Sequence, residues 1–170
     1  MFHDQLIVLA LQEDIGHGDL TTESIVDKNL EATGTIQAQE DLIVCGIEVA
    51  GRVFHLLDPE IQFHAEVADG EKVQDEKVLA RVSGSARKLL NAERIALNFL
   101  QRLSGIATTT SHYVELIRGT GAKVIDTRKT TPGLRDLEKY AVRCGGGRNH
   151  RFGLSDGILI KDNHLQIAGG

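Results

Sequence analysis

The residues best suited to chemistry in this chain are cations that directly follow two short apolar segments. Val124–Thr127 leads into the sequence Arg128-Lys129-Thr130, and Gly157–Ile160 leads into Lys161-Asp162-Asn163-His164. Short apolar runs of this kind predict buried strands. Ligands of parallel α/β sheets bind at the carboxyl ends of the strands. We therefore expect Arg128, Arg151 and Lys161 to converge on one pocket that binds an anion.

The segment between these strands adds further anion-binding groups. Three glycines, Gly145–Gly147, allow backbone N–H groups to turn toward an anion, and His150 and Arg151 supply side-chain donors. Arg suits carboxylate or phosphate groups, which it binds through two parallel hydrogen bonds. The same segment is also compatible with a flexible connection between a helix and a strand. Together with the two strand ends, it predicts a pocket for a ligand that carries several negative groups.

The charge of the chain is unevenly distributed, which bears on its partners. The 170 residues carry a net charge of −5, yet residues 123–170 hold nine Lys and Arg against five Asp and Glu. This asymmetry favours an anionic partner for the C-terminal part, although a solvated basic surface would show it too. Aromatic residues make up 4% of the chain and Trp is absent, so a platform for stacking nucleic-acid bases has few candidates.

Hydrophobic periodicity predicts the elements that position these groups. Alternation from Ala32 to Ser83 indicates a small sheet-rich unit whose turn at Asp69-Gly70 resembles the rhythm of lipoyl-type barrel-sandwich folds, but no carrier lysine stands at that turn. Helices are predicted over 6–13, over 86–103 after the capping residue Ser85, and from Ser104-Gly105 to about Arg118.

A further helix is predicted between the two apolar strands. Thr131 is its expected cap, Pro132 its first residue and Cys144-Gly145 its end. Its inward-facing residues are expected to be Leu134, Leu137, Tyr140 and Ala141. Strand, helix and strand form one βαβ unit, but two-stranded parallel sheets are rare and a complete (β/α)₈ barrel takes about 250 residues. We therefore expect the chain to be the N-terminal part of a longer protein.

Several classes of protein are disfavoured by the sequence. No apolar run approaches the roughly 20 residues of a membrane-spanning helix, and the N-terminus lacks the basic region of a signal peptide, so cytoplasm is the expected location. Cys45 and Cys144 stand far apart in the sequence without zinc-site spacing, which predicts two buried thiols. No nucleophile elbow, Walker loop or HExxH motif is present.

Four segments, in this order, resemble the family of carboxylating nicotinate-nucleotide pyrophosphorylases, also called quinolinate phosphoribosyltransferases. They are EDIGHGDLTT (13–22), AERIALNFLQRLSGIAT (92–108), DTRKTTPGLRDLEKYAVRCGGGRNHRFGLSD (126–156) and ILIKDNH (158–164). The resemblance covers nearly the whole chain, and the last two segments are the most specific.

The resemblance implies a fold and a reaction. The fold is an α+β N-terminal sandwich domain (1–110, containing the long helix 86–103) followed by the incomplete start of an α/β-barrel phosphoribosyltransferase domain (111–170). The reaction is transfer of a phosphoribosyl group from phosphoribosyl pyrophosphate to quinolinate with loss of CO₂, giving nicotinate mononucleotide in de novo NAD synthesis. Mg²⁺ is the implied cofactor, with its ligands expected beyond residue 170. On this basis the 170-residue species is expected to be inactive.

The resemblance also assigns roles to residues of this chain. Arg128, His150 and Arg151, with Thr127 beside them, match the quinolinate-binding groups of the family. Lys129 and Lys161 match lysines that face the substrate and its phosphates, and are the expected catalytic residues. Arg94 matches an arginine that reaches into the neighbouring subunit's pocket, so a homodimer with shared active sites is implied.

Two alternatives stand beside this interpretation. One is the molybdenum-utilisation relative with the same fold, against which ILIKDNH and EDIGHGDLTT argue. The other is a non-catalytic fragment that only dimerises or binds anions.

Overall fold

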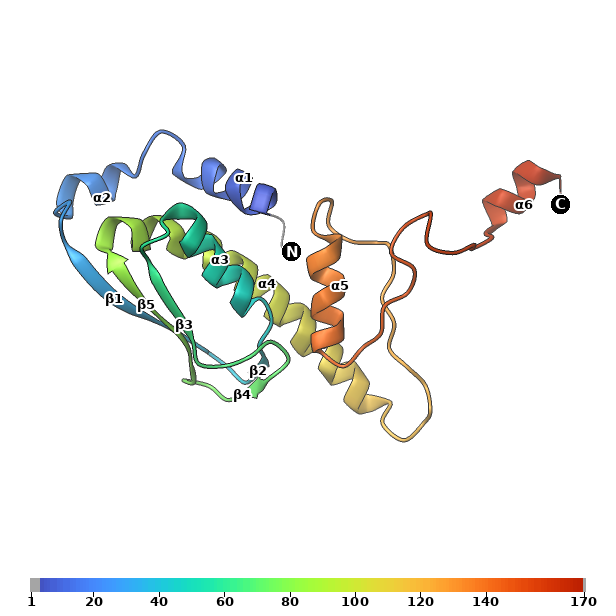
Figure 1. The fold of residues 1–170 in the computed structure, drawn as a ribbon. Coiled ribbons are helices and arrows are strands. Elements are labelled where there is room, and N and C mark those ends of the chain that lie inside the picture. The colour runs from blue at the N-terminus through green and yellow to red at the C-terminus, as the bar shows by residue number, and fades with distance from the viewer. Residues whose placement is uncertain (1–3, 170) are drawn as a thin grey trace.

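An antiparallel three-stranded sheet organises the first half of the chain in the computed structural model, which describes residues 4–169 (Figure 1). Its strand order is β1-β5-β3, with Glu31 opposite Ser85 and Gln62 opposite Ser83. The strands are β1 (Glu31–Gln37), β3 (Gln62–Ala65) and β5 (Val78–Ser85), and a smaller antiparallel pair is formed by β2 (Leu42–Ile43) and β4 (Lys72–Val73). The sheet predicted from the two-residue period is confirmed for these segments.

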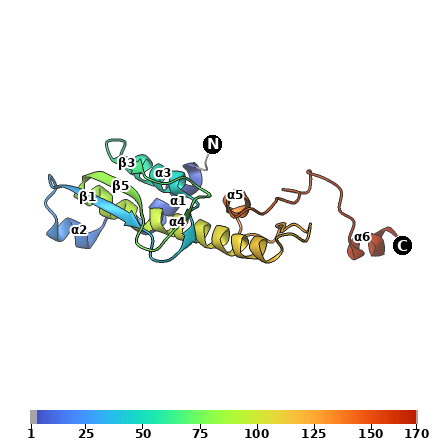
Figure 2. The same ribbon diagram turned by 90° about the horizontal axis from the view of Figure 1, so that it is seen from below.

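Two helices cover this sheet, and one of them is not predicted from the sequence. They are α3 (Ile47–Leu57) and α4 (Ala86–Leu116), and α3 packs against both α4 and β3. The small sheet-rich unit expected from Ala32 to Ser83 also contains α3, which the two-residue period does not predict. Ile47, Ala50 and Phe54 recur at spacings of three and four and form one buried helical face. Two further helices, α1 (Asp4–Ile15) and α2 (Leu20–Ile25), lie alongside (Figure 2), and α1 fulfils its prediction.

The junction between α3 and α4 depends on Gly46, which precedes α3. Its φ of 98° is left-handed, and a Cβ there would lie 2.8 Å from Leu103 Cδ1, so the close approach requires glycine. Because Gly46 has no capping side chain, a distant residue caps α3: Asp69 Oδ1 accepts hydrogen bonds from Gly46 N (2.7 Å) and Ile47 N (2.9 Å). Asp69 Oδ2 also accepts from the Tyr140 hydroxyl at 3.0 Å, which ties the later part of the chain to this junction.

Helix α4 is continuous, so the break expected at Ser104-Gly105 is wrong. Ser104 is buried within α4, and its hydroxyl forms hydrogen bonds with the backbone just before α3. Ser104 Oγ accepts from Cys45 N at 3.0 Å and donates to Cys45 O at 3.2 Å. Thr108 Oγ1, one turn on, accepts from Ile43 N at 2.9 Å. Ser104 therefore occurs inside α4, and not at a helix end, because its hydroxyl satisfies buried backbone groups of Cys45.

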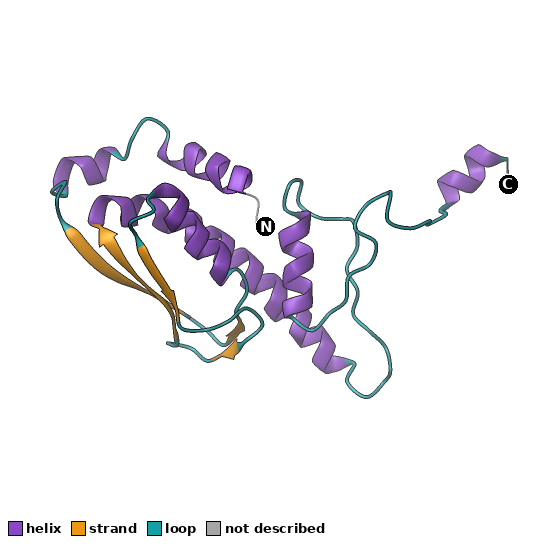
Figure 3. Ribbon diagram, in the orientation of Figure 1, coloured by secondary structure: helices purple, strands orange, loops and turns teal. Residues whose placement is uncertain are grey.

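The last third of the chain is mostly irregular (Figure 3). Its helices are α5 (Arg135–Cys144) and α6 (Asp162–Ala168), and α5 packs against α4. The predicted inward residues of α5 are confirmed, with Leu137 and Ala141 buried and Leu134 and Tyr140 partly buried. The helix begins at Arg135 rather than Pro132, because Thr131–Leu134 forms a turn closed by Leu134 N donating to Thr131 O at 3.0 Å.

Neither predicted parallel strand forms in residues 4–169. Ile125 makes a single parallel bridge with Arg148, and Gly157–Ile160 is irregular and exposed. A strand requires a continuous ladder of hydrogen bonds to a neighbour. Around Ile125 the ladder is limited to Asp126 N donating to Arg148 O (3.1 Å) and Arg148 N donating to Val124 O (2.9 Å), and no bridge forms at 157–160 among the described residues. The predicted βαβ unit is therefore absent from this part of the structure.

Two smaller features complete the fold. Cys45 is buried and Cys144 partly buried, and both are free thiols, with burial raising the pKa of Cys45. No helix among residues 4–169 combines the length and apolar character needed to cross a membrane.

Candidate anion-binding site

The Asp126 carboxylate joins the two segments that carry the predicted binding residues. Its Oδ1 accepts from His150 N at 2.8 Å and from Lys139 Nζ at 2.5 Å, and its Oδ2 accepts from Asn149 Nδ2 at 2.5 Å. The Lys139 and Asp126 side chains are only 3% and 7% exposed. This buried ion pair therefore holds residue 126 against residues 149–150 on the surface of α5.

Arg135, at the start of α5, makes a second connection between the same segments. Its guanidinium donates to Thr130 Oγ1 (3.1 Å), to Phe152 O (3.3 Å) and to Arg128 O (3.4 Å). One side chain thus contacts the backbone on both sides of the candidate site. The backbones next to Arg128 and Arg151 are thereby joined through Arg135.

Arg128 and Arg151 are two half-buried cations whose guanidinium groups are incompletely hydrogen-bonded. Both are half-buried, and the Nε atom of each is buried without a hydrogen-bond partner in the described part of the chain. Arg151 Nη1 donates to Gly157 O at 2.9 Å. Buried polar groups usually have partners, so these two Nε–H groups stand out as unsatisfied donors on adjoining segments.

The neighbouring predicted residues are exposed. Thr127 Oγ1 accepts from Lys129 N at 3.0 Å, a local turn that leaves the Lys129 side chain in solvent. His150 and Arg151 line a surface hollow of about 430 Å³ together with Asp136, Lys139, Arg143, Asn149, Phe152 and Asp156. The hollow contains charges of both signs, and Arg128 is not among the residues that line it.

Lys161 and Arg94 are not brought to these residues. Lys161 precedes α6, which projects away from the rest of the molecule (Figures 1 and 2), and residues 157–169 are exposed throughout. With no strand at 157–160, nothing in the described residues carries Lys161 to the expected strand end. Convergence of Lys161 with Arg128 and Arg151 is therefore not observed. Arg94 lies on the exposed side of α4.

A third group of contacts fixes the loop that follows Arg128. Glu138 Oε1 accepts from Arg102 Nε (3.0 Å) and Nη2 (2.5 Å), and Glu138 Oε2 accepts from Thr131 N at 3.1 Å. Burial alone raises the pKa of Glu138, but the hydrogen bonds from Arg102 and Thr131 outweigh it and hold the pKa below its ordinary value. The charged form of Glu138 therefore links α4, α5 and the loop.

Sequence reasoning missed the residues that support the site: Asp126, Arg135, Glu138, Lys139 and Asn149. Apolar periodicity assigns polar positions of α5 to solvent, although Glu138 and Lys139 are buried. The one available signal was Asp126, a carboxylate inside an otherwise apolar segment, since a charge at such a position needs a partner.

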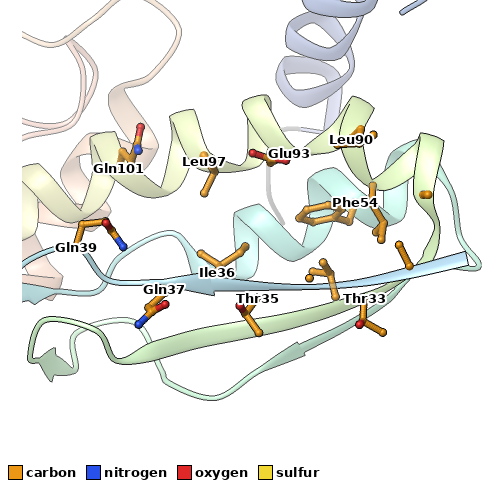
Figure 4. A pocket seen from close by; sticks show the side chains of 15 residues that line it. Thr33, Thr35, Ile36, Gln37, Gln39, Phe54, Leu90, Glu93, Leu97 and Gln101 are labelled. Carbon is orange, nitrogen blue, oxygen red and sulfur yellow. The ribbon is translucent and has the colours of Figure 1, made fainter. Parts of the chain in front are cut away.

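A larger groove of about 550 Å³ lies elsewhere, between β1 and α4 (Figure 4). Its lining is mostly apolar, with Ile36, Phe54 and Leu97 facing it, and Glu93 is its only charged residue. This composition does not suit an anion.

The fold is that of an α+β protein in which Arg128 and Arg151 each keep an Nε–H without a hydrogen-bond partner among the described residues. Residues 19–104 match the model of the quinolinate phosphoribosyl transferase N-terminal domain, and residues 106–170 match that of the C-terminal domain. The chain therefore belongs to the quinolinate phosphoribosyl transferase family, and the two models meet within α4.

Similar proteins carry names consistent with that family. The chain is 46% identical over 161 residues to a probable carboxylating nicotinate-nucleotide pyrophosphorylase of Synechocystis and 50% identical over 158 residues to one of Bacillus subtilis. These alignments cover 94% and 92% of this chain but 54% of each relative, so the chain spans about half their length. The crystal structure of NadC from Streptococcus pyogenes superposes with a TM-score of 0.93 at 46% identity, covering 98% of this chain and 59% of that one.

Proposed function

We propose that this chain contributes the quinolinate-binding part of a phosphoribosyltransferase that converts quinolinate and phosphoribosyl pyrophosphate to nicotinate mononucleotide, pyrophosphate and CO₂. The observation that carries the proposal is the pair of buried, unpartnered Nε atoms of Arg128 and Arg151 on segments joined by Asp126 and Arg135. Family membership and the names of the relatives supply the substrate. Quinolinate carries two adjacent carboxylates, which suits two arginines carried on adjoining segments.

In the proposed reaction, the chain's own residues bind and orient the dicarboxylate. Arg128 and Arg151 hold its carboxylates, with His150 and Thr127 as further hydrogen-bonding groups. The pyridine nitrogen then forms a bond to C1 of the ribose while the bond from that carbon to pyrophosphate breaks. Lys129 and Lys161 are proposed to offset the negative charge on the leaving group.

Decarboxylation follows from the charge of the ribosylated ring. The bond between C2 and its carboxylate breaks, the electron pair stays on the ring carbon beside the positive nitrogen, and a proton from solvent replaces CO₂. This step needs no general base. It does require the carboxylate to stay oriented, which is the role proposed for the two arginines.

We also propose the domain division, the dimer and the metal that the family implies. Residues 1–110 are assigned to the N-terminal sandwich domain and 111–170 to the start of the α/β barrel. Arg94 is proposed to reach the site of a second subunit, in a cytoplasmic homodimer that uses neither nucleic acid nor membrane as a partner. Mg²⁺ is proposed as the cofactor on the basis of the family alone, with its ligands beyond residue 170.

The proposal is tested in two stages. Calorimetry of the 170-residue chain with quinolinate should show binding that Arg151→Met weakens; absence of binding by the unaltered chain would refute the site. Turnover is then measured in a polypeptide of the family's full length that carries residues 1–170 unchanged. Formation of nicotinate mononucleotide that requires both substrates is expected. Binding without product would instead favour the non-catalytic alternative.

The shared site is tested by mixing two inactive full-length variants, Arg94→Ala and Lys161→Ala. Heterodimers should recover part of the activity, because one of their two sites would contain both native side chains. No recovery, with subunit exchange verified, would count against the role of Arg94.

A further inference from the structure

The buried pair of Asp126 and Lys139 lies beside the candidate site, yet the proposed reaction assigns it no task. We propose that these two residues are positioning residues that set the spacing of Arg128 and Arg151, and thereby make the site select a dicarboxylate over a monocarboxylate. This inference rests on the proposed function, in which quinolinate is the ligand. Nicotinate, which has one carboxylate fewer, is the monocarboxylate used for comparison.

The contacts of the pair fix the backbone immediately before Arg151. Lys139 Nζ donates to His150 O at 3.1 Å, and Asp126 Oδ1 accepts from His150 N at 2.8 Å. Both backbone polar groups of His150 are thus held by the same ion pair. The carbonyl of His150 belongs to the peptide that leads into Arg151, so the direction in which Arg151 leaves the backbone is set there.

The same carboxylate lies two residues before Arg128 in the sequence. Asp126 N donates to Arg148 O at 3.1 Å, and Asn149 Nδ2 donates both to Asp126 Oδ2 (2.5 Å) and to Lys139 O (2.8 Å). Each arginine therefore follows within two residues of a group fixed by this network. A change in the network should alter the distance between the arginines rather than remove either one.

Joining two loops through a buried ion pair has a cost in free energy. Burial of an ion pair costs several kcal/mol per ion in desolvation, which the attraction and hydrogen bonds must offset. Apolar packing could supply stability alone, but it would not hold a backbone N–H and a C=O in fixed directions. The segments on both sides lack regular strands, so their geometry depends on such contacts. The network accordingly favours precision over stability.

The experiment measures selectivity in the 170-residue chain. The dissociation constants for quinolinate and for nicotinate are determined by calorimetry for the unaltered chain and for Lys139→Met and Asp126→Asn. Arg52→Met is the matched control, because it removes the cation of the Arg52–Asp4 pair (2.7 Å), which joins α3 to α1 away from the site. Partial unfolding would lower the fitted stoichiometry. A misplaced arginine would instead lower the ratio of the nicotinate dissociation constant to the quinolinate dissociation constant, which measures the preference for quinolinate.

We expect quinolinate to be preferred at least about tenfold by the unaltered chain and control, and that preference to fall about tenfold in both site variants. Unchanged preference in folded variants would overturn the inference while leaving the proposed function intact. Loss in Lys139→Met alone would also overturn it, since Lys139 would then contact the ligand directly. If Lys139→Met does not fold, Asp126→Asn alone decides. Failure of the unaltered chain to bind quinolinate would refute the proposed function itself.

Discussion

Replacing Glu138 by glutamine should destabilise the connection between α4, α5 and the loop after Arg128. Glu138 is 8% exposed, and the change removes the charge that accepts two hydrogen bonds from Arg102. Hydrogen bonds to charged groups contribute about 1.5–3 kcal/mol. Arg102 is about half exposed, which places the expected loss near the lower end, about 2 kcal/mol. The amide oxygen of glutamine can still accept from Thr131 N.

The effect should depend on pH in a defined direction. The folded-state pKa of Glu138 lies below its ordinary value of 4.5, so its charged form stabilises the fold. That contribution is fully present above about pH 4.5 and is lost as the pH falls through the folded-state pKa. Glutamine does not titrate, so the difference between the two proteins should shrink as the pH falls through the folded-state pKa of Glu138.

Urea unfolding at pH 7 and pH 3 measures this directly. With a denaturant slope of about 2 kcal/mol per molar, the midpoint of Glu138→Gln should be about 1 M lower at pH 7. Glu115→Gln is the control, because Glu115, near the end of α4, pairs with Arg118 in an exposed position and the change should alter stability by less than about 0.5 kcal/mol. Equal differences at both pH values, or none at pH 7, would refute the assigned role of the Glu138 charge.

Three further predictions test the core and the site. Leu103→Ala, at a side chain 1% exposed, should lower the free energy of unfolding by about 3–4 kcal/mol in urea titrations; a loss below about 1 kcal/mol would contradict its central packing. Ser104→Ala should cost about 1–3 kcal/mol because Cys45 N loses its acceptor, and a neutral result would mean that water replaces the hydroxyl. Arg128→Met and Arg151→Met should each raise the dissociation constant for quinolinate about tenfold or more with little change in melting temperature; unaltered affinity would argue against contact with the ligand.

The sequence predicted elements whose pattern is local. The alternation in β1 and β5 and the apolar spacing in α1 and α5 each describe one buried face, and the structure confirms them. Helix α3 was missed because its short apolar segment fits either period when read inside a sheet-rich unit. The continuity of α4 was missed because the partner of Ser104 is Cys45, 59 residues away in the chain, and no local pattern reveals that contact.

The residues of the candidate site likewise differ in whether a local sequence pattern predicts them. Arg128, His150 and Arg151 stand out because their charge and position next to apolar or glycine-rich segments are visible locally. Lys139 does not, because on the helix it follows the pattern of a solvated residue and only the fold brings Asp126 within 2.5 Å of it. Paired burial of opposite charges is a tertiary property that a single sequence does not display.

The difference between the predicted and the missed site residues follows from the irregular backbone on which the candidate site lies. The candidate arginines lie on irregular segments, and ordering such backbone costs about 1–2 kcal/mol per residue in entropy. Arg128 and Arg151 cannot supply that energy to each other, since like charges repel until an anion lies between them. The hydrogen bonds around Asp126, Lys139 and Arg135 must therefore hold the segments before ligand arrives. An anion-binding site on loops accordingly needs two sets of residues, one exposed enough to bind and one buried enough to position, and substitutions in the second set should alter selectivity without removing a single ligand contact.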